Sequence, residues 1–142
     1  MLLAAATLLL DGRERRMNIG LLEDDADTAE YLAIALDMAG HKVHTYADGS
    51  TFLHTLFAML GQPAPLPYDL LLVDLTLAGT MSGQEVIEAL QQDATTQQLP
   101  IIVISAMSWS ILQDIQARYP RVRVLQKPFR LQALLHFIDT SQ

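Results

Sequence analysis

Cysteine is absent from this chain of 142 residues. Its absence excludes disulfide bonds, thiolate metal sites and a cysteine nucleophile, and it is compatible with a cytoplasmic protein. Positive charge is also scarce, because nine Lys and Arg residues face sixteen Asp and Glu residues, which gives a net charge of −7. Such a surface offers no electrostatic basis for binding nucleic acid or an anionic membrane. The length suggests one domain that can bury its own core.

The chain has no apolar stretch that is long enough to cross a bilayer. Residues 1–10 are apolar and residues 11–16 are mostly charged, but the basic leader of a signal peptide is lacking. Residues 1–16 could be an amphipathic docking segment, a disordered tail, or sequence upstream of a true start at Met17. We favour the last two interpretations and expect an N-terminal extension of residues 1–16 followed by a domain of residues 17–142.

A short apolar run, Leu-Leu-Leu-Val, leads directly into Asp74. Continuous apolar runs of this length suit a strand that is buried on both faces. An unpaired carboxylate is costly in a low-dielectric core, so we expect Asp74 at the carboxyl end of the strand. In open α/β sheets, ligands bind at that edge. Taken alone, Asp74 would more simply cap the following turn, but the same pattern recurs along the chain.

Apolar runs alternate with helical periodicities from residue 19 onward. We expect strands over residues 19–22, 41–46, 69–73, 100–105 and 121–126, and helices over residues 27–39, 50–60, 82–91, 108–118 and 131–139. The connections are short, which favours right-handed crossovers and a parallel sheet. The expected fold class is α/β, a flavodoxin-like (βα)5 three-layer sandwich with a parallel five-stranded sheet in the order 2-1-3-4-5.

Polar side chains follow four of the five expected strands. Glu23 and Asp24 follow the first strand, Asp74 the third, Ser105 the fourth and Lys127 the fifth. In the expected strand order these groups converge on one edge of the sheet. Carboxylates at close range repel one another, and a hard divalent cation such as Mg²⁺ relieves that repulsion and shares its shell with phosphate. An ammonium and a hydroxyl group would complete a phosphate site.

This pattern resembles the receiver domain of bacterial two-component response regulators, over residues 18–140. Each matching element is weak by itself, but together, in this order and at the ends of these strands, they are specific. The matching residues are the acidic pair Glu23-Asp24, Asp74, Ser105 followed by Ala106, and Lys127-Pro128-Phe129.

The resemblance implies that Asp74 is the nucleophile that takes a phosphoryl group from the phosphohistidine of a histidine kinase. It also implies that Lys127 pairs with the acceptor carboxylate and then with the phosphoryl oxygens, and that Ser105 donates a hydrogen bond to the phosphoryl group. A cis peptide bond between Lys127 and Pro128 is a further implication of the resemblance. These roles agree with phosphoryl transfer, which depends on positioning and charge neutralisation.

The resemblance also implies a Mg²⁺ site. Asp24 would bind the ion directly, Glu23 would bind it through water, and Asp74 and the backbone carbonyl of Thr76 would be further ligands. Asp25 lies next to the acidic pair, but we interpret it as an acid at the start of a helix, where the helix dipole favours negative charge.

Two departures from the family pattern bear on the site and on its output. Ala78 stands where the family usually has Pro, in a loop from Asp74 to Gly83 that is one residue longer than the common form. Val124 stands where the family usually has Tyr or Phe, whose ring rotates inward on activation. We therefore expect an intact phosphorylation site without the usual aromatic switch.

The residues leave three functions to distinguish. The first is a phosphoacceptor signalling module rather than a turnover enzyme. It would bind a sensor histidine kinase or phosphotransfer protein and a downstream protein, and it could form a homodimer. It would stand alone unless the chain is a fragment. Haloacid-dehalogenase-type enzymes also form an aspartyl phosphate, but they need an Asp where this chain has Thr76. The alternative is a degenerate receiver that binds proteins without being phosphorylated, which the presence of Val124 keeps open.

Overall fold

Five parallel strands form one sheet in the order β2-β1-β3-β4-β5, which confirms the expected fold class. The computed structural model describes residues 16–61, 65–77 and 79–141. The strands are β1 (Asn18–Leu22), β2 (Lys42–Tyr46), β3 (Leu70–Asp74), β4 (Ile101–Ser105) and β5 (Arg123–Gln126). Every residue of β3 and β4 is buried, as expected for apolar strands at the centre of a parallel sheet.

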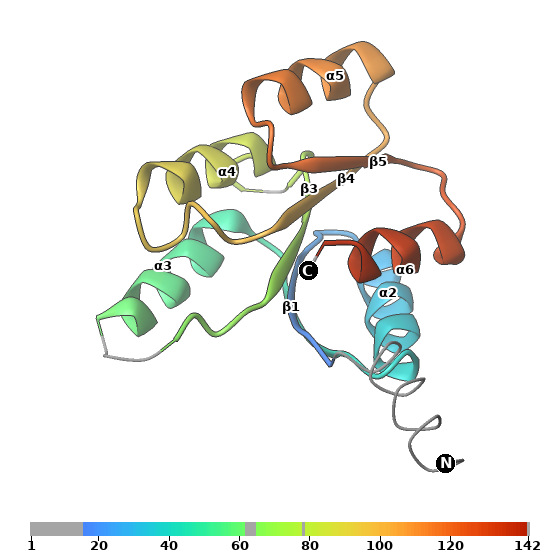
Figure 1. The fold of residues 1–142 in the computed structure, drawn as a ribbon, viewed down its shortest axis with the longest axis horizontal. Helices are drawn as coiled ribbons and strands as arrows, with labels where there is room; N and C mark the ends of the chain where they lie inside the picture. Colours follow the sequence, from blue (N-terminus) through green and yellow to red (C-terminus); the bar gives the residue numbers. More distant parts are fainter. Residues whose placement is uncertain (1–15, 62–64, 78, 142) are drawn as a thin grey trace, which may run out of the picture.

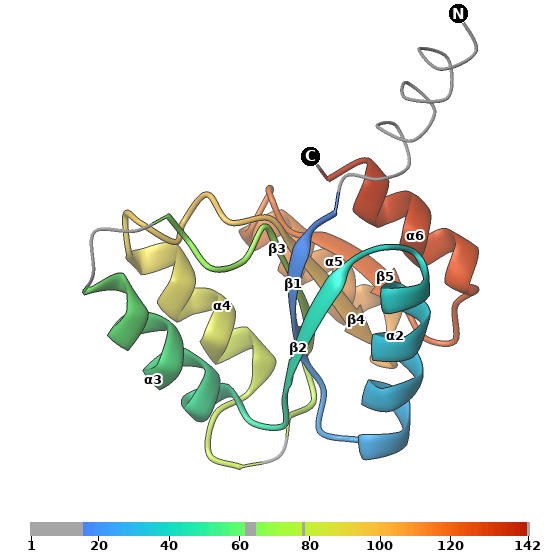
Figure 2. The same cartoon turned by 90° about the horizontal axis from the view of Figure 1, so that it is seen from below.

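Helices cover both faces of the sheet and make it the middle of three layers (Figure 1). The helices are α2 (Ala26–Met38), α3 (Gly49–Leu60), α4 (Gly83–Gln92), α5 (Trp109–Arg118) and α6 (Leu131–Asp139). Helices α3, α4 and α5 pack on one face and share one apolar core with the sheet. Helices α2 and α6 pack on the other face over a second core, and Figure 2 shows these two helices side by side.

Side-chain caps fix where three helices begin. Asp25 accepts a hydrogen bond from the Thr28 N–H at the start of α2, and Asp48 does the same for α3. Ser82 and Glu85 form the reciprocal capping box at the start of α4 that the sequence predicted. These caps end the preceding loops at defined residues and so position the loops that surround the carboxyl edge of the sheet.

The observed elements differ from the expected ones by one or two residues at their ends. Strand β3 includes Asp74, so this carboxylate is the last residue of the strand. Strand β5 begins at Arg123 rather than at residue 121. The reason is that Val122, although buried, donates its backbone N–H to the Tyr119 carbonyl in a turn after α5 and not to the sheet.

Two expectations concern residues outside the described part of the chain. Residues 1–15 of the expected N-terminal extension lie there, and so does Ala78. Among the described residues, no helix combines the length and the apolar character that crossing a bilayer requires.

Candidate functional site

The strand register brings the first and third strands together at the carboxyl edge of the sheet. Leu22 at the end of β1 is paired with Val73 in β3, so Glu23 and Asp74, the next residue of each segment, are neighbours. Ser105 ends β4, and Lys127 follows β5. All of these predicted side chains therefore lie on one edge, but they differ in what they contact.

Lys127 joins the two buried carboxylates. Its Nζ donates hydrogen bonds to Glu23 Oε1 at 2.8 Å and to Asp74 Oδ2 at 3.0 Å. Both carboxylates are almost completely buried, with Glu23 3% and Asp74 6% exposed, whereas the Lys127 side chain is 24% exposed. Charge-assisted hydrogen bonds of this kind are shorter and stronger than neutral ones. The ammonium group is therefore held beside Asp74 at the mouth of the site. The Lys127–Pro128 peptide bond is cis, which confirms the prediction made for it.

Burial and hydrogen bonding shift the pKa values of Glu23 and Lys127. Burial raises the pKa of the Glu23 carboxyl group above its ordinary value, and the hydrogen bond from Lys127 opposes that shift without cancelling it. Burial acts to lower the pKa of Lys127, but its hydrogen bonds with Glu23 and Asp74 outweigh burial, and the net pKa is raised. Lys127 consequently stays positively charged across the physiological pH range.

The second oxygen of Asp74 is held by the backbone that follows it. The Thr76 N–H donates to Asp74 Oδ1 at 3.0 Å, so each carboxylate oxygen has its own donor. The role of the Thr76 carbonyl as a metal ligand stays a prediction. The hydrogen bond from the Thr76 N–H to Asp74 was not predicted from the sequence. The tendency of Asp side chains to bond the backbone two residues later was the signal that could have revealed it.

Gly83 is a second residue that sequence reasoning missed. A Cβ atom at this position would lie 2.2 Å from the Asp74 carbonyl oxygen and 2.7 Å from the Leu75 Cα. The Gly83 N–H donates to the Leu75 carbonyl at 3.1 Å, which brings the start of α4 against the end of β3. Only glycine allows this close approach, so Gly83 helps to fix the backbone of Asp74.

Glu23, Asp24 and Asp74 form a cluster that suits a hard cation. One oxygen of each carboxylate can be chosen so that all three atoms lie within 4.8 Å of one another. Asp24 is exposed, while the other two are buried. Mg²⁺ prefers oxygen ligands, binds a small number of carboxylates and keeps several waters, so one exposed and two buried carboxylates fit it. Asp25, by contrast, faces the helix: its carboxylate accepts the Thr28 N–H at 3.0 Å and a hydrogen bond from the Thr28 hydroxyl.

Ser105 lies at the same edge but has a different partner. Its side chain is completely buried, and its Oγ accepts a hydrogen bond from the Met107 N–H at 3.1 Å. The Gln126 amide group donates to the Met107 carbonyl at 3.0 Å and ties the loop after β4 to the end of β5. Within the described residues, the structure thus brings Lys127, Glu23 and Asp74 together, whereas it places the Ser105 hydroxyl against its own loop.

Val124 fills the position where an aromatic residue was the family expectation. It is 6% exposed and contributes to the core beneath α3, α4 and α5. A valine in a strand is restricted at χ1 and is too short to swing between the core and the surface. Trp109, at the start of α5, is the large aromatic side chain nearest in sequence to the loop that follows β4, and it is 49% exposed.

Comparison with known proteins agrees with this geometry. The family model of the response regulator receiver domain matches residues 19–139. The chain is similar to the chemotaxis protein CheY4 of Vibrio cholerae at 19% identity, with a TM-score of 0.72 over 89% of this chain and 99% of that chain. It is similar to the phosphorylated cyanobacterial phytochrome response regulator RcpA at 22% identity, with a TM-score of 0.70 over 88% of this chain and 90% of that chain.

A third similar structure is the signal receiver domain of a modulated diguanylate cyclase from Desulfovibrio desulfuricans G20. It has 24% identity and a TM-score of 0.72, over 89% of this chain and 93% of that chain. At these identities the solved structures establish the shared fold, and the family match, over most of the chain, establishes membership. The chain belongs to the response regulator receiver domain family.

Proposed function

We propose that Asp74 accepts a phosphoryl group from the phosphohistidine of a sensor histidine kinase or a phosphotransfer protein. The observation that carries the proposal is the contact between the Lys127 ammonium group and Asp74 Oδ2 at 3.0 Å, inside a cluster of three carboxylates. A partly exposed cation that already bonds the acceptor carboxylate is suited to receive the negative oxygens of a phosphoryl group. The phosphorylated form of RcpA, which shares this fold, supports the same chemistry.

In the proposed transfer, a carboxylate oxygen of Asp74 attacks the phosphorus atom in line with the phosphorus–nitrogen bond of the donor. The new bond joins phosphorus to the Asp74 oxygen, and the bond to the imidazole nitrogen breaks. The electron pair leaves with the imidazole, which takes up a proton to become neutral histidine. Lys127 follows the negative charge from the carboxylate to the phosphoryl oxygens, and the Thr76 N–H keeps the carboxylate oriented.

Glu23, Asp24 and Asp74 would hold Mg²⁺, with the Thr76 carbonyl as a further ligand. Three ionised carboxylates and one ammonium group leave two negative charges uncompensated, which matches the charge of a divalent cation. When bound, Mg²⁺ supplies positive charge that offsets the repulsion between the site and an incoming phosphoryl group. Ser105 would release the Met107 N–H and donate its hydroxyl group to the phosphoryl oxygens.

The protein would act as a signalling module in the cytoplasm and would not turn over a substrate. Its partners would be the phosphodonor and a downstream protein, and it could form a homodimer. Nucleic acid and membranes are not proposed as partners because the net charge is −7. The intact set of acids, Lys127 and Ser105 favours phosphorylation over the degenerate receiver that the sequence left open.

The experiment is phosphorylation of the purified chain with phosphoramidate and Mg²⁺, followed by intact mass spectrometry. Phosphoramidate contains the same phosphorus–nitrogen bond as phosphohistidine and needs no known partner. We expect a gain of one phosphoryl group in the original chain and none in Asp74→Asn. Asp114→Asn is the matched control, since Asp114 is exposed on α5, and it should be phosphorylated normally. Phosphorylation that persists in Asp74→Asn, or that fails in the original chain, would overturn the proposal.

A further inference from the structure

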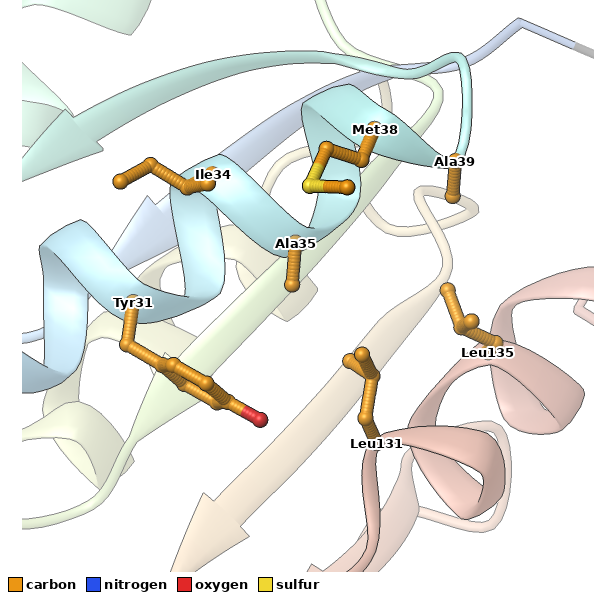
Figure 3. Close-up of a pocket in the computed structure, with 7 residues that line it drawn as sticks. All are labelled: Tyr31, Ile34, Ala35, Met38, Ala39, Leu131 and Leu135. Atoms are coloured by element: carbon orange, nitrogen blue, oxygen red, sulfur yellow. The ribbon is translucent and has the colours of Figure 1, made fainter.

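An apolar groove lies between α2 and α6, on the face of the sheet opposite α3, α4 and α5 (Figure 3). It has a volume of about 420 Å³ and is lined by Tyr31, Ile34 and Met38 from α2 and by Leu131 and Leu135 from α6. None of its lining residues belongs to the acidic cluster around Asp74. The groove is therefore separate from the proposed phosphorylation site.

The α2 side of this groove is unusually exposed for apolar side chains. Tyr31 is 59%, Ile34 is 53% and Met38 is 82% exposed. Large apolar side chains that lie singly on a surface need no explanation, but these three occupy successive turns of one helix and continue into Leu131 and Leu135. Contiguous apolar surface of this kind is typical of a face that another segment or molecule covers.

We propose that residues 1–10 of the same chain, Met-Leu-Leu-Ala-Ala-Ala-Thr-Leu-Leu-Leu, cover this groove. These residues lie outside the described part of the chain. Their composition matches the groove because they contain no charged side chain and are almost entirely apolar. Docking was one of three interpretations of the N-terminal extension, and the groove gives it an acceptor surface. The inference does not depend on phosphoryl transfer.

The point at which the described chain begins makes this docking possible. Arg16 lines a hollow together with Asp37 and Gly40, at the carboxyl-terminal end of α2, and Met38 and Ala39 at the same end line the groove. The five residues 11–15 can span at most about 17 Å. Residues 1–10 cover about 15 Å even as a helix, while the stretch of α2 from Tyr31 to Met38 is about 10 Å long. The segment is therefore long enough to reach the groove and fill it.

Charge supports the same path. Helix α2 has no basic residue in its last turn, and Asp37 adds a negative charge there. The carbonyl end of a helix is its negative pole and attracts cations. Residues 11–16 carry Arg13, Arg15 and Arg16 against Asp11 and Glu14, so the segment that leads into Arg16 has a small positive net charge.

A spin label can test the proposal in the full chain, because the chain has no cysteine that would compete for the label. Thr7→Cys carrying a nitroxide should broaden the methyl NMR signals of Ile34, Met38 and Leu135. A label at Gln113→Cys, on exposed α5, is the matched control and should leave these signals sharp. Unchanged signals with the Thr7 label would overturn the proposal.

Two further arms separate the other possible occupants. In the first arm, isotope-labelled protein without a nitroxide is mixed with Thr7→Cys protein that carries a nitroxide but no isotope label. Broadening of the signals in this mixture would mean that a second copy fills the groove, and it would overturn the proposal. Replacing Ile34 and Met38 together by Lys should abolish the intramolecular broadening, whereas Ile111→Lys, at an apolar position of α5 that is 44% exposed, should not. Natural protein whose intact mass begins at Met17 would also overturn the proposal.

Discussion

Polar side chains stand at both edges of the sheet, but their hydrogen-bond partners differ. At the carboxyl edge, charged side chains bond to one another in addition to the backbone of their own loops: Lys127 donates to both Glu23 and Asp74, and Asp74 also accepts the Thr76 N–H. None of these three groups is needed to complete the hydrogen bonds of the sheet. Their charges are matched to one another, and a ligand with the right charge can replace one partner by another.

At the amino edge, side chains bond to the backbone. His41 accepts the Met17 N–H on its Nδ1 at 3.2 Å, and Asp69 accepts the Asn18 N–H on its Oδ2 at 2.8 Å. Arg123 donates to the Phe137 carbonyl at the end of α6 at 3.0 Å and lies over the Phe137 ring. These bonds satisfy backbone groups where strands begin and a helix ends.

The difference teaches how to tell a functional polar cluster from a structural one in this fold. Polar groups at the amino edge complete the backbone, so losing one should lower stability and leave the chemistry unchanged. Glu23, Asp74 and Lys127 at the carboxyl edge complete each other, so losing one of these three should chiefly remove chemistry. The predictions below test this division, beginning with the largest expected effect.

Lys127→Met should slow phosphorylation by phosphoramidate about 100-fold, the usual cost of removing one preorganised donor to developing negative charge. The control is Lys42→Met, which removes an exposed lysine at the amino edge, where β2 begins. Rates are measured by intact mass at fixed Mg²⁺. Equal rates for the two variants would mean that the ammonium group at the carboxyl edge has no part in the transfer.

Gly83→Ala should lower the free energy of unfolding by about 1–3 kcal/mol, because the added methyl group meets backbone atoms that cannot rotate away. Gly61→Ala is the control: its nearest neighbour would be the Ala58 carbonyl oxygen at 3.6 Å, so we expect little change. Urea denaturation gives both values. Gly83→Ala should affect both stability and chemistry, because moving the backbone of Asp74 should slow phosphorylation as well. An unchanged urea midpoint would show that the start of α4 can shift freely.

His41 should make the stability of the amino edge depend on pH. Burial lowers the pKa of His41 below its ordinary value of 6.5, and the charge of Asp139 opposes this only in part. The unfolded chain therefore binds the proton more readily than the folded chain does. Stability is fully present above pH of about 6.5 and declines as the pH falls through the folded pKa, with a limiting slope of about 1.4 kcal/mol per pH unit.

The measurement is the urea midpoint between neutral and mildly acidic pH. His41→Gln should flatten the decline, while His44→Gln, at an exposed position of β2, should keep it. A decline that is the same in all three proteins would assign the effect to other groups.

Beryllofluoride with Mg²⁺, a mimic of the phosphoryl group, should give the smallest effect: a shift of the Met107 amide signal. The Met107 N–H now donates to Ser105 Oγ, and it loses this acceptor if the hydroxyl group turns toward Asp74. The shift should continue into the start of α5 without a change at Val124. It should disappear in Ser105→Ala, and shifts confined to residues around Glu23 and Asp74 would show that the site sends no signal to α5.

The sequence was sufficient to predict the fold and to place the candidate side chains at the carboxyl edge of the sheet. The apolar run before Asp74, together with the cost of burying an unpaired carboxylate, located this residue at the end of β3. The Ser82 and Glu85 motif predicted the capping box at the start of α4. These features are local, because each depends on residues that are close in sequence.

The details that the sequence could not supply are those that depend on three-dimensional contacts. Val122 is apolar and buried like a strand residue, so its place in a turn could not be read from the pattern. The Ser105 hydroxyl accepts the Met107 N–H, a partner that no sequence pattern indicated, and its predicted role toward a phosphoryl group stays a prediction. That Lys127 contacts Glu23 rather than Asp24 depends on side-chain length and on the register between β1 and β3.

Asp74 is 6% exposed, so only a small part of its surface is open to any molecule that approaches its carboxylate. On the proposed function, the phosphodonor approaches through this small opening, and so does the water that later hydrolyses the acyl phosphate. The rate of phosphorylation and the lifetime of the acyl phosphate are therefore linked. Substitutions that widen the opening should shorten the lifetime of the acyl phosphate as they hasten its formation, and formation and decay rates measured on the same set of variants would reveal that link.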